Sequence, residues 1–598
     1  MVKPGSPSLF KPRFRRDGPE NADMVVLSAR IVTSDRDNPR AEALAVKGGR
    51  FTYVGDNRGA GEHIGPDTDV INARRKTVTP GFVDNHCHVL WVGASTSLST
   101  TTLYECESYD ELSRAVVEYA AANPDMLLVS GAGWRYDYIP GRIPNREMLD
   151  EILADRPVIL MSIGGQCGWL NTAALDLLLE RNPLALERLA PARDEKTGEY
   201  TGVLNRYHAM NVFDYFTLEE LGPGVEEGMY SGMTDAVQSA LSVGVTTMND
   251  VQVYRPLMPL ILGFRERGGL DHARVRCSFY VGGHALEDEE SLVKDLEWWR
   301  DLGASESDPH LILGDSLKFY IDGVFCNHTS FMAEPYSDTE AEHGDPVWTR
   351  EGFDRVIELI DGMGFQACTH AVGDAGIHRV VNSYGRAVRL NGARDARHRC
   401  DHCELPLPED RKVMAEFEIY AAMQPAHFYA DETTAQVLGH ERLQRFMPWR
   451  SLEKAGVTVS FGSDWCAGPI NPLYGLLIAA LRINYEGKTD WGRQESVGLE
   501  DGIMHWTIDS AKALRMEKEV GSIEVGKHAD FVVFNRNPLK MDSWLFLLTT
   551  ELELGAFDDF VDMTVVGGDV AYGKADASMR VDSPANTGGV FSVHCSQV

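Results

Sequence analysis

The sequence predicts an α/β protein: a (β/α)8 TIM-like barrel, with a small β-sandwich domain built from both termini and an inserted cap. Three observations carry this prediction. Apolar, β-branched runs alternate with helical stretches along the middle of the chain, and many such βα units in succession favour a closed parallel barrel. Short strand-like runs of similar composition occur near both ends. A long connection separates the first barrel strand from the next clear βα unit.

Both ends of the chain show the same pattern of short strand-like runs. Residues 24–80 consist of short alternating runs separated by Gly, Asn and Asp, a pattern that predicts an antiparallel sheet. The segments 529–534 (ADFVVF) and 563–570 (MTVVGGDV) look the same. We therefore expect residues 24–80 and 520–575 to form one composite β-sandwich domain.

Between the ends, residues 81–95 and 226–519 are expected to form the barrel. The connection at 96–225 contains helical segments at 109–122 and 170–180, and a connection of that length is usually functional. We expect it to be a cap subdomain. The later barrel strands are expected at 244–251, 275–281, 317–321, 366–370, 420–424 and 457–461.

An excess of acidic residues limits the partners that the chain can bind. Its 598 residues include 57 Lys and Arg against 89 Asp and Glu, a net charge of −32. Phosphate backbones and anionic lipid headgroups repel such a chain unless it has a local basic patch, and none occurs beyond the first twenty residues. We therefore expect a small-molecule substrate, and neither nucleic acid nor a membrane as partner.

The sequence also predicts a location. No apolar run approaches the roughly eighteen residues that a transmembrane helix needs, and the charged N-terminal arm lacks the apolar core of a signal peptide. The 10 cysteines are spread along the chain without the spacing of a disulfide framework, which indicates a reducing compartment. The expectation is a cytoplasmic protein.

The first candidate ligands lie in TPGFVDNHCHV, residues 79–89. His86 and His88 are two positions apart, so on an extended strand both imidazoles project from the same face and Cys87 projects from the other. Neutral imidazole is the commonest protein ligand for Zn²⁺ and related metals. An HxH pair alone often binds no metal. This pair, however, lies at the C-terminal end of an apolar strand, which is where the active-site residues of a (β/α)8 barrel are found.

Three further polar residues end later predicted strands. His370 closes FQACTH, His402 lies in RCDHCEL, and Asp464 follows VTVSFGSDW. Each has an ordinary structural explanation, since single histidines are commonly packed or exposed and an aspartate after a strand commonly caps a helix. A barrel, however, would bring all of them to one mouth together with the HxH pair. The combination predicts a metal centre.

Lys318, in SLKFYIDG, also ends a strand. A bare ammonium in a barrel mouth is costly, and its ordinary explanation is a salt bridge to Asp315 or Asp322. If the amine has instead reacted with CO₂, the oxygens of the carbamate can bridge two metal ions. N-carboxylation would turn a buried cation into an anionic ligand.

Together these residues resemble the amidohydrolase superfamily, and most closely its YtcJ-like branch, amidohydrolase family 3. The likeness spans residues 24–575; the order of the motifs is specific for the superfamily and the branch, and it says little about the substrate. The motifs are TPGFVDNHCH (79–88), GAGW (131–134), LKFYIDG (317–323), THAVGDAGIHRVV (369–381), DHCEL (401–405), MQPAHF (423–428), GSDW (462–465) and GSIEVGKHADFVV (521–533).

The resemblance implies a ligand for every position of a two-metal site. His86 and His88 would bind the more buried metal, His370 and His402 would bind the second, and a carboxylated Lys318 would bridge the two. One or two divalent ions per chain are implied, and zinc is the expected metal. Because superfamily members often assemble, a homo-oligomer is expected as well.

The resemblance also implies the chemistry. Asp464 would touch the first metal and act as general acid/base. A metal-bound hydroxide would then hydrolyse the C–N bond of an amide, N-acyl or cyclic amide compound. The chain would thus be a hydrolase acting on carbon-nitrogen bonds other than peptide bonds.

Two departures from the family fall in the predicted cap. Arg135 follows Trp134 where the branch commonly has an acid, and Gly165-Gln166 stands where many members have Gly-His. Arg135 facing the pocket would suit an anionic group on the substrate, whereas a solvent-facing arginine would have no such role. The residues expected to contact substrate are Trp134, Arg135, Gln166, Trp169, Asp322, Gln424, His427 and Trp465.

Two alternatives to an amidohydrolase stay open. The same ligand set serves C–C bond hydrolysis or decarboxylation on related barrels, and product analysis would separate those reactions from C–N hydrolysis. The other alternative is a non-catalytic scaffold homologue. Such a homologue would be expected to have lost metal ligands, whereas every ligand position is intact in this sequence. Metal content and loss of activity on chelation discriminate an enzyme from a scaffold.

Overall fold

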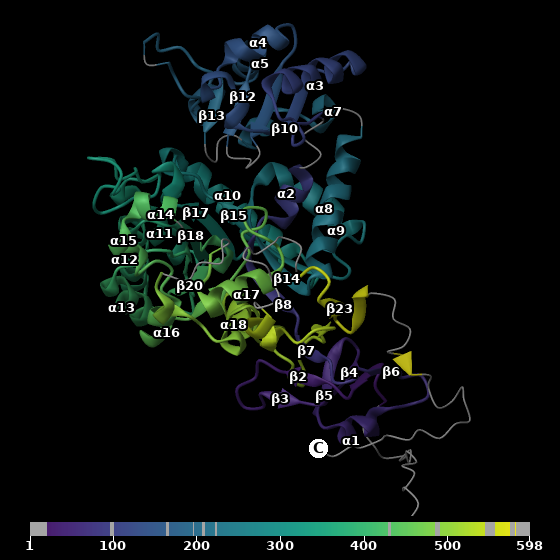
Figure 1. Ribbon diagram of the computed structural model, residues 1–598. Helices are drawn as coiled ribbons and strands as arrows, with labels where there is room; N and C mark the ends of the chain where they lie inside the picture. Colours follow the sequence, from purple (N-terminus) through teal and green to yellow (C-terminus); the bar gives the residue numbers. More distant parts are fainter. Residues whose placement is uncertain are drawn as a thin grey trace, which may run out of the picture. The chain divides into compact units, whose positions relative to one another are not determined.

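The computed structural model describes residues 21–95, 101–162, 167–194, 196–205, 210–221, 224–428, 432–484, 491–544, 557–573 and 580–581 (Figure 1). The chain divides into two compact units. The first unit combines Met1–His88, Val237–Tyr254 and Leu270–Val598, and the second combines Val89–Ala236 and Arg255–Gly269. Within the described residues, no helix has the length and apolar character needed to cross a lipid bilayer.

A parallel sheet forms the centre of the first unit, which confirms the predicted barrel fold. Eight strands follow one another in chain order, and β16 (Leu311–Ile312) adds a short strand beside β15. Every pairing within this sheet is parallel. The eight strands are β8 (Phe82–Cys87), β14 (Val245–Val253), β15 (Arg274–Tyr280), β17 (Ser316–Tyr320), β18 (Gln366–Ala371), β19 (Arg399–His402), β20 (Tyr420–Met423) and β21 (Val459–Phe461).

Hydrogen bonds join the first strand of this sheet to the segment that follows the last. The Asp464 N–H donates to the His86 carbonyl at 2.7 Å. Asp84 reinforces the joint, because its buried carboxylate accepts from the N–H of Ser463 at 2.9 Å and from its hydroxyl at 2.5 Å. The carboxyl ends of β8 and β21 are therefore neighbours in space.

Helices supply the crossovers that parallel strands require. In α11 (Arg350–Gly362), the Thr349 side chain caps the first turn, and Phe353, Val356 and Ile360 form a buried stripe at helical spacing. Such a stripe holds the helix against the sheet. The other helices of the first unit are α1 (Asn57–Ala60), α10 (Glu289–Ser305), α12 (Asp374–Asn391), α13 (Pro408–Glu416), α14 (Glu432–Leu438), α15 (His440–Leu443), α16 (Trp449–Lys454), α17 (Pro472–Leu481), α18 (Leu499–His505) and α19 (Ile508–Ala513), and α8 (Val225–Ser242) runs through residues of both units.

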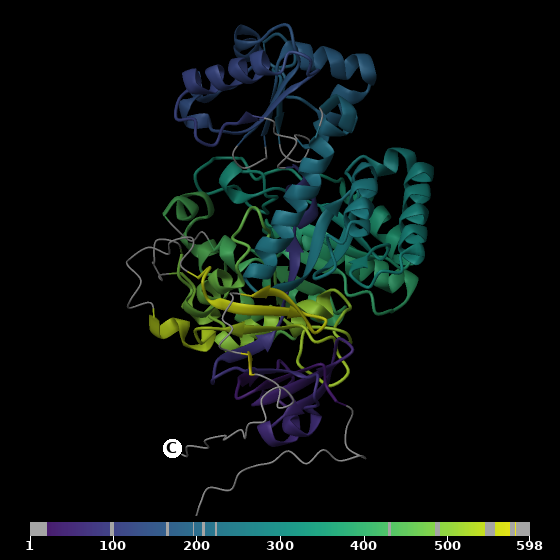
Figure 2. The ribbon, with the colours of Figure 1, turned by 90° about the vertical axis from the view of Figure 1, so that its right-hand side faces the viewer.

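Two further sheets of the first unit draw their strands from both ends of the chain, as expected (Figure 2). Their apolar faces share one core that includes Leu44, Phe51, Val78, Phe531 and Val565. One sheet has the order β25 (Arg580–Val581), β6 (Asp69–Asn72), β1 (Met24–Leu27), β4 (Ala43–Lys47), β5 (Arg50–Gly55). The other has the order β24 (Asp569–Gly573), β23 (Val561–Val566), β22 (Phe531–Phe534), β7 (Thr77–Pro80), β2 (Arg30–Val32), β3 (Arg40–Ala41).

The expectation of a purely antiparallel sheet over residues 24–80 is wrong. β1 pairs antiparallel with β4 and parallel with β6, while β7 pairs parallel with β2 and antiparallel with β22. A short turn forces antiparallel pairing only between consecutive strands of one sheet. Here β1 and β2 enter different sheets, so their neighbours come from distant parts of the chain and take either direction.

The second unit has a sheet of its own, which was not predicted from the sequence. Its order is β13 (Val203–Asn205), β12 (Cys167–Leu170), β11 (Val158–Ser162), β10 (Val129–Trp134), β9 (Thr101–Thr102). β9, β10 and β11 are parallel, whereas β12 is antiparallel to both of its neighbours. The helices of this unit are α2 (Val89–Ser95), α3 (Tyr109–Ala122), α4 (Arg146–Ile152), α5 (Thr172–Arg181), α6 (Ala185–Leu189), α7 (Leu218–Leu221) and α9 (Met258–Glu266).

One helix of this unit matches the sequence prediction and another is shifted. The helix expected at 109–122 is α3. The helix expected at 170–180 starts later, at Thr172, because Leu170 still belongs to β12 and Asn171 ends the strand. The Asn171 side chain accepts hydrogen bonds from the N–H groups of Val158 and Ala174, so it caps α5 and ties the helix to β11 at once.

Candidate metal centre

The HxH pair ends the buried strand β8. His86 is 1% exposed and His88 is half-buried at the strand's carboxyl end. Cys87 between them turns its sulfur toward the Asn249 carbonyl oxygen, at 3.5 Å. This alternation leaves both imidazoles on the side of the strand where Asp464 lies.

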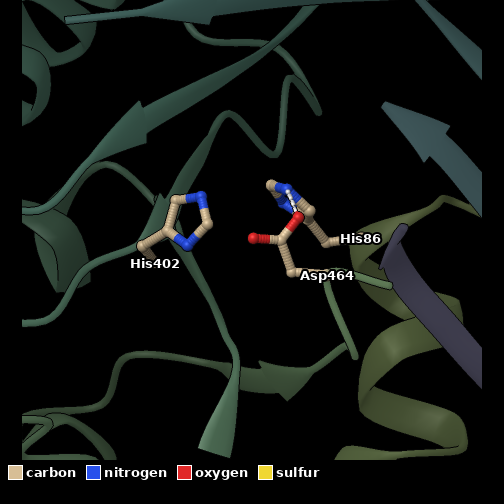
Figure 3. A group of neighbouring side chains, drawn as sticks. All are labelled: His86, His402 and Asp464. Atoms are coloured by element: carbon tan, nitrogen blue, oxygen red, sulfur yellow. Dashed lines mark ion pairs between the residues drawn. The ribbon is translucent and has the colours of Figure 1, made fainter. Parts of the chain in front are cut away.

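His86, His402 and Asp464 form a compact group of ligand-type side chains (Figure 3). One ligand atom from each lies within 4.8 Å of the other two, and all three residues are buried. A carboxylate oxygen of Asp464 lies 3.4 Å from His86 Nε2 and 3.1 Å from His88 Nε2. The structure therefore brings together residues from the first, sixth and eighth strands of the barrel, as the sequence predicts.

The carboxyl group of Asp464 remains charged in this surrounding. Burial by itself would raise its pKa, but His86, His88 and His402 outweigh that effect and hold the pKa well below its usual range. An ionised carboxylate facing imidazole nitrogens suits a cation between them.

His370 lies against the same group. Its ring centroid is 4.2 Å from that of His402, and its Nε2 lies 3.1 Å from the Gly323 carbonyl oxygen. Burial, followed by the charge of Lys318, lowers the pKa of His370 to about 3. Burial likewise lowers the pKa of His402 well below its usual value. Both histidines are thus neutral, which is the state that metal binding requires.

Lys318 is fully buried at the centre of β17 and not at the expected strand end, and its ion pair is not the expected one either. Its amine lies 3.7 Å from a carboxylate oxygen of Asp401 and 4.7 Å from the centre of the Tyr320 ring. The alternative partners suggested by the sequence are engaged elsewhere: Asp315 pairs with Arg276 at 2.8 Å, and Asp322 accepts backbone N–H groups. Burial lowers the pKa of Lys318, with partial compensation by Asp401.

Asp401, the first residue of the DHCEL motif, belongs to this site although no role was predicted for it from the sequence. Its carboxylate lies 2.8 Å from His86 Nδ1 and accepts two hydrogen bonds from Arg399, at 3.0 and 2.9 Å. Burial opposes its charge, but Arg399, His86 and Lys318 hold its pKa well below the usual range. Its place directly before His402 was the available signal, although its partner on β8 could not be read from sequence.

A second group of ligand-type side chains consists of His402, Glu404 and His427. Their ligand atoms also lie within 4.8 Å of one another, and all three are buried. His427 was expected to contact substrate, and Glu404 was not singled out. Burial, with the nearby charges of Asp322 and Asp464, raises the pKa of Glu404 to about 8.

Two other residues of the first unit that were expected to contact substrate, Asp322 and Gln424, are both buried. Asp322 is 1% exposed and accepts the N–H groups of Phe331, Val372 and Gly373, so its carboxylate holds two loops together. Burial raises the pKa of Asp322 to about 7. Gln424 is fully buried at the end of β20. The substrate contacts of these two residues stay predictions.

Trp465 follows Asp464 directly. Its carbonyl accepts the His88 N–H at 2.9 Å, its N–H donates to the Ser463 hydroxyl at 2.9 Å, and the residue is half-buried. It therefore lies beside the metal-type ligands, and its contact with substrate also stays a prediction.

The expected substrate residues of the second unit are placed within that unit. Trp134 and Trp169 are fully buried in its core, and their indole N–H groups donate to the carbonyls of Leu160 and Asn145. The unit's own packing thus accounts for both rings. The Arg135 side chain is 40% exposed and pairs with Asp137 at 3.2 Å. Gln166 lies outside the described residues.

Known proteins resemble this chain along most of its length. Protein LONG AFTER FAR-RED 3 of Arabidopsis thaliana is 28% identical over 534 residues, which are 86% of this chain and 88% of that protein. YtcJ of Bacillus subtilis (strain 168) is 26% identical over 556 residues, 91% of this chain and 98% of its own. N-substituted formamide deformylase of Arthrobacter pascens is 25% identical over 528 residues, 86% and 94% of the two chains.

A solved structure shares the fold. A metal-dependent hydrolase from Pyrococcus horikoshii, described as uncharacterized, superposes with a TM-score of 0.67 at 21% identity, covering 86% of this chain and 98% of its own. The sequence model that describes the amidohydrolase family matches residues 69–572. The match confirms the resemblance seen in the motifs, and it includes every strand of the parallel barrel and each of the candidate ligands above. This chain therefore belongs to the amidohydrolase family.

Proposed function

We propose that this chain is a metal-dependent hydrolase that cleaves the C–N bond of a small molecule, such as an amide, an N-acyl compound or a cyclic amide. The observation that carries the proposal is the group formed by His86, His402 and Asp464, three buried side chains whose ligand atoms lie within 4.8 Å of one another. Membership of the amidohydrolase family supports it. So does the name of one relative, a deformylase of N-substituted formamides, because formamides are amides.

The donor set fits a divalent transition metal. Imidazole and carboxylate together are the usual ligands of zinc in enzymes, and the lowered pKa of His402 keeps that ring neutral. We assign the ion to His86, His88 and Asp464, with His402 beside them. A divalent ion at such a position polarises a carbonyl and lowers the pKa of water.

Lys318 is a candidate for a further ligand in N-carboxylated form. Its amine is buried, and burial lowers its pKa, which favours the neutral amine that reacts with CO₂. The carbamate would be an anion, and the positive charges of Arg399 and of a bound metal ion would stabilise it. Until it reacts, the amine rests against Asp401 at 3.7 Å.

Asp464 is assigned the proton transfers. Its carboxylate is ionised at neutral pH because its pKa is held well below the usual range against the effect of burial. It can therefore accept a proton as the nucleophile attacks, and then pass that proton to the leaving nitrogen. The backbone N–H of Asp464 donates to the His86 carbonyl, which fixes the carboxylate against the HxH pair.

The experiment that tests the proposal combines metal analysis with a substrate screen. The purified chain is analysed for metal, treated with a chelator, and reloaded with Zn²⁺. N-formyl, N-acyl and cyclic amide compounds are then screened, each with and without a carboxylate, and products are identified. Hydrolysis of a C–N bond that stops on chelation and returns with Zn²⁺ supports the proposal. A chain that binds no metal and cleaves no compound contradicts it, and C–C cleavage would replace the reaction class.

A further inference from the structure

Tyr280 lies at the end of the third barrel strand, β15, and has no role in the function proposed above. Phe279 before it packs against Trp298 and Trp299 of α10, with centroid distances of 5.9 and 5.5 Å. Because successive side chains of a strand point to opposite sides, the Tyr280 ring points away from this helix and into the barrel. It lies at the carboxyl end of the barrel, where the candidate metal ligands are found.

A row of ring contacts joins Tyr280 to the candidate metal centre. The Tyr280 ring centroid lies 5.7 Å from that of Tyr320, which lies 5.1 Å from that of His370. The row continues from His370 to His402 at 4.2 Å, and from His402 to His86 at 4.8 Å. Tyr280 is therefore the last ring of a continuous row that starts at the metal-type side chains.

The hydroxyl groups of the two tyrosines differ in their partners. The Tyr320 hydroxyl donates to the side-chain oxygen of Gln252 at 2.5 Å. No hydrogen bond joins the Tyr280 hydroxyl to any of the described residues. Tyr280 is half-buried, and burial raises the pKa of its phenol to about 12, so the hydroxyl keeps its proton at neutral pH. A donor in such a place is normally satisfied by water or by a ligand.

The main chain around Tyr280 is fixed, and one side of its hydroxyl is left open. The Val281 N–H donates to the Lys318 carbonyl at 2.9 Å, which holds the end of β15 against β17. Gly282 follows, where a Cβ would lie 3.6 Å from the Tyr280 hydroxyl oxygen. A side chain larger than that of alanine would therefore lie against the hydroxyl, whereas glycine leaves this side free for another molecule.

We propose that Tyr280 is a specificity-determining residue, whose hydroxyl donates a hydrogen bond to an acceptor oxygen that the substrate carries away from the cleaved C–N bond. The inference rests on the proposed function, which places that bond at the group of His86, His402 and Asp464. A carboxylate oxygen is the stronger acceptor for such a donor, and a carboxamide oxygen is the weaker one. The substrates are therefore N-acyl compounds that carry one of these two groups.

The test measures binding to the full chain and needs no turnover. The chain carries Asp464→Asn, which suppresses hydrolysis, and is dialysed against Zn²⁺ before calorimetry gives the Kd of each compound. One series places the acceptor on the amine part: N-acetylphenylalanine, its primary amide, and N-acetylphenethylamine, which lacks both groups. The other series places it on the acyl part: N-benzylsuccinamic acid, its primary amide, and N-benzylbutanamide.

We expect Tyr280→Phe to weaken binding of the carboxylate roughly 10- to 100-fold and of the carboxamide roughly 3- to 10-fold in one of the series. The compound that lacks both groups should bind as before. Tyr320→Phe is the matched variant, because it removes a hydroxyl that is already bonded to Gln252. It should keep the preference within each series. Gly282→Val, whose side chain covers the Tyr280 hydroxyl, should lose the same preference as Tyr280→Phe.

Circular dichroism and thermal unfolding establish that each variant is folded, and either Tyr280→Phe or Gly282→Val carries the test if the other fails to fold. An unchanged preference in both variants would overturn the inference. An equal loss for all members of a series, or no binding of any compound before Tyr280 is changed, would overturn it as well. Product analysis with the wild type separates the two proposals: if no C–N bond is cleaved although Tyr280→Phe loses the preference, the proposed reaction is wrong and the binding role of Tyr280 stands.

Discussion

His86 Nδ1 lies 2.8 Å from a carboxylate oxygen of Asp401, a residue 315 positions further along the chain. A histidine that binds a metal commonly gives its other ring nitrogen to a carboxylate, which sets the tautomer and the direction of the ring. Arg399, two positions earlier on the same strand, holds Asp401 with two hydrogen bonds. The sixth barrel strand therefore orients an imidazole of the first.

The first prediction concerns this contact. Asp401→Asn should weaken metal binding roughly 10- to 100-fold, since the support of a ligating imidazole is typically worth that much. Competition with a chromophoric chelator measures the change. Asp410→Asn is a matched control, because Asp410 is also a buried carboxylate 2.7 Å from a histidine Nδ1, that of His378, but on α13. Equal metal affinities in the two variants would refute the assignment of Asp401 as a positioning residue.

The second prediction concerns proton transfer. Asp464→Asn should lower kcat by about 10²- to 10⁴-fold, because an amide can neither accept nor return the proton. Much of the metal should stay bound, since the imidazoles remain. Steady-state kinetics on a substrate from the screen, together with metal analysis of the same sample, checks both parts. A variant with near-normal turnover would remove Asp464 from the proton transfers.

The third prediction concerns the buried amine. In CO₂-free buffer without metal, Lys318→Met should raise the free energy of unfolding, because the variant no longer buries an amine whose charged form is disfavoured by burial. Asp401 keeps its bonds to Arg399 in the variant. Because burial lowers the folded-state pKa of Lys318, the wild type should gain stability as pH rises toward 10.5, the unfolded value, and the variant should lack this gain.

Urea unfolding over a pH series measures the third prediction. The informative quantity is the difference in unfolding free energy between Lys318→Met and the wild type at each pH. A variant that is less stable than the wild type at every pH would show that the amine is well accommodated as a cation.

The fourth prediction concerns pH and lies away from the metal-type residues. Burial disfavours the charged form of His505, but Asp509 at 3.0 Å and Glu453 at 3.3 Å outweigh it and raise its pKa to about 9. Lys512 and Arg450 face these carboxylates as well. The protonated imidazole should therefore stabilise the fold fully below pH 6.5, its unfolded pKa, and lose that contribution as pH rises through about 9.

His505→Gln should accordingly cost about 3 kcal/mol of unfolding free energy near pH 6, since one pKa unit corresponds to ~1.4 kcal/mol. The cost should shrink as pH approaches 10. Chemical denaturation of both proteins at several pH values gives the comparison. A cost that does not change with pH would mean that His505 does not titrate in this way.

The barrel and its main candidate ligands could be predicted because they obey local rules. The period of two along a strand puts His86 and His88 on one side, and parallel strands end at one mouth, where His402 and Asp464 are found. The helix at 109–122 was predictable from the same kind of regularity.

What could not be predicted depends on partners distant in sequence. Asp401 and Glu404 flank His402 within four positions, yet Arg399 and His86 anchor the first as an ionised carboxylate, whereas burial raises the pKa of the second to about 8. The sequence DHCEL by itself does not distinguish the environments of these two carboxyl groups. The sheet of the second unit was missed for a related reason, because β12 is only 4 residues long and contains a glycine, so its pairing with β11 rather than its own propensity makes it a strand.

The hydrogen bond between Asp464 and His86 has a consequence for how the protein is made. A ribosome delivers the N-terminal part of a chain first, so the HxH motif emerges long before the strand that must close against it. The proposed metal centre cannot be complete until that strand and Asp464 after it have been translated. Metal uptake should therefore belong to the end of biosynthesis, and a nascent chain arrested before residue 464 should hold its cation weakly.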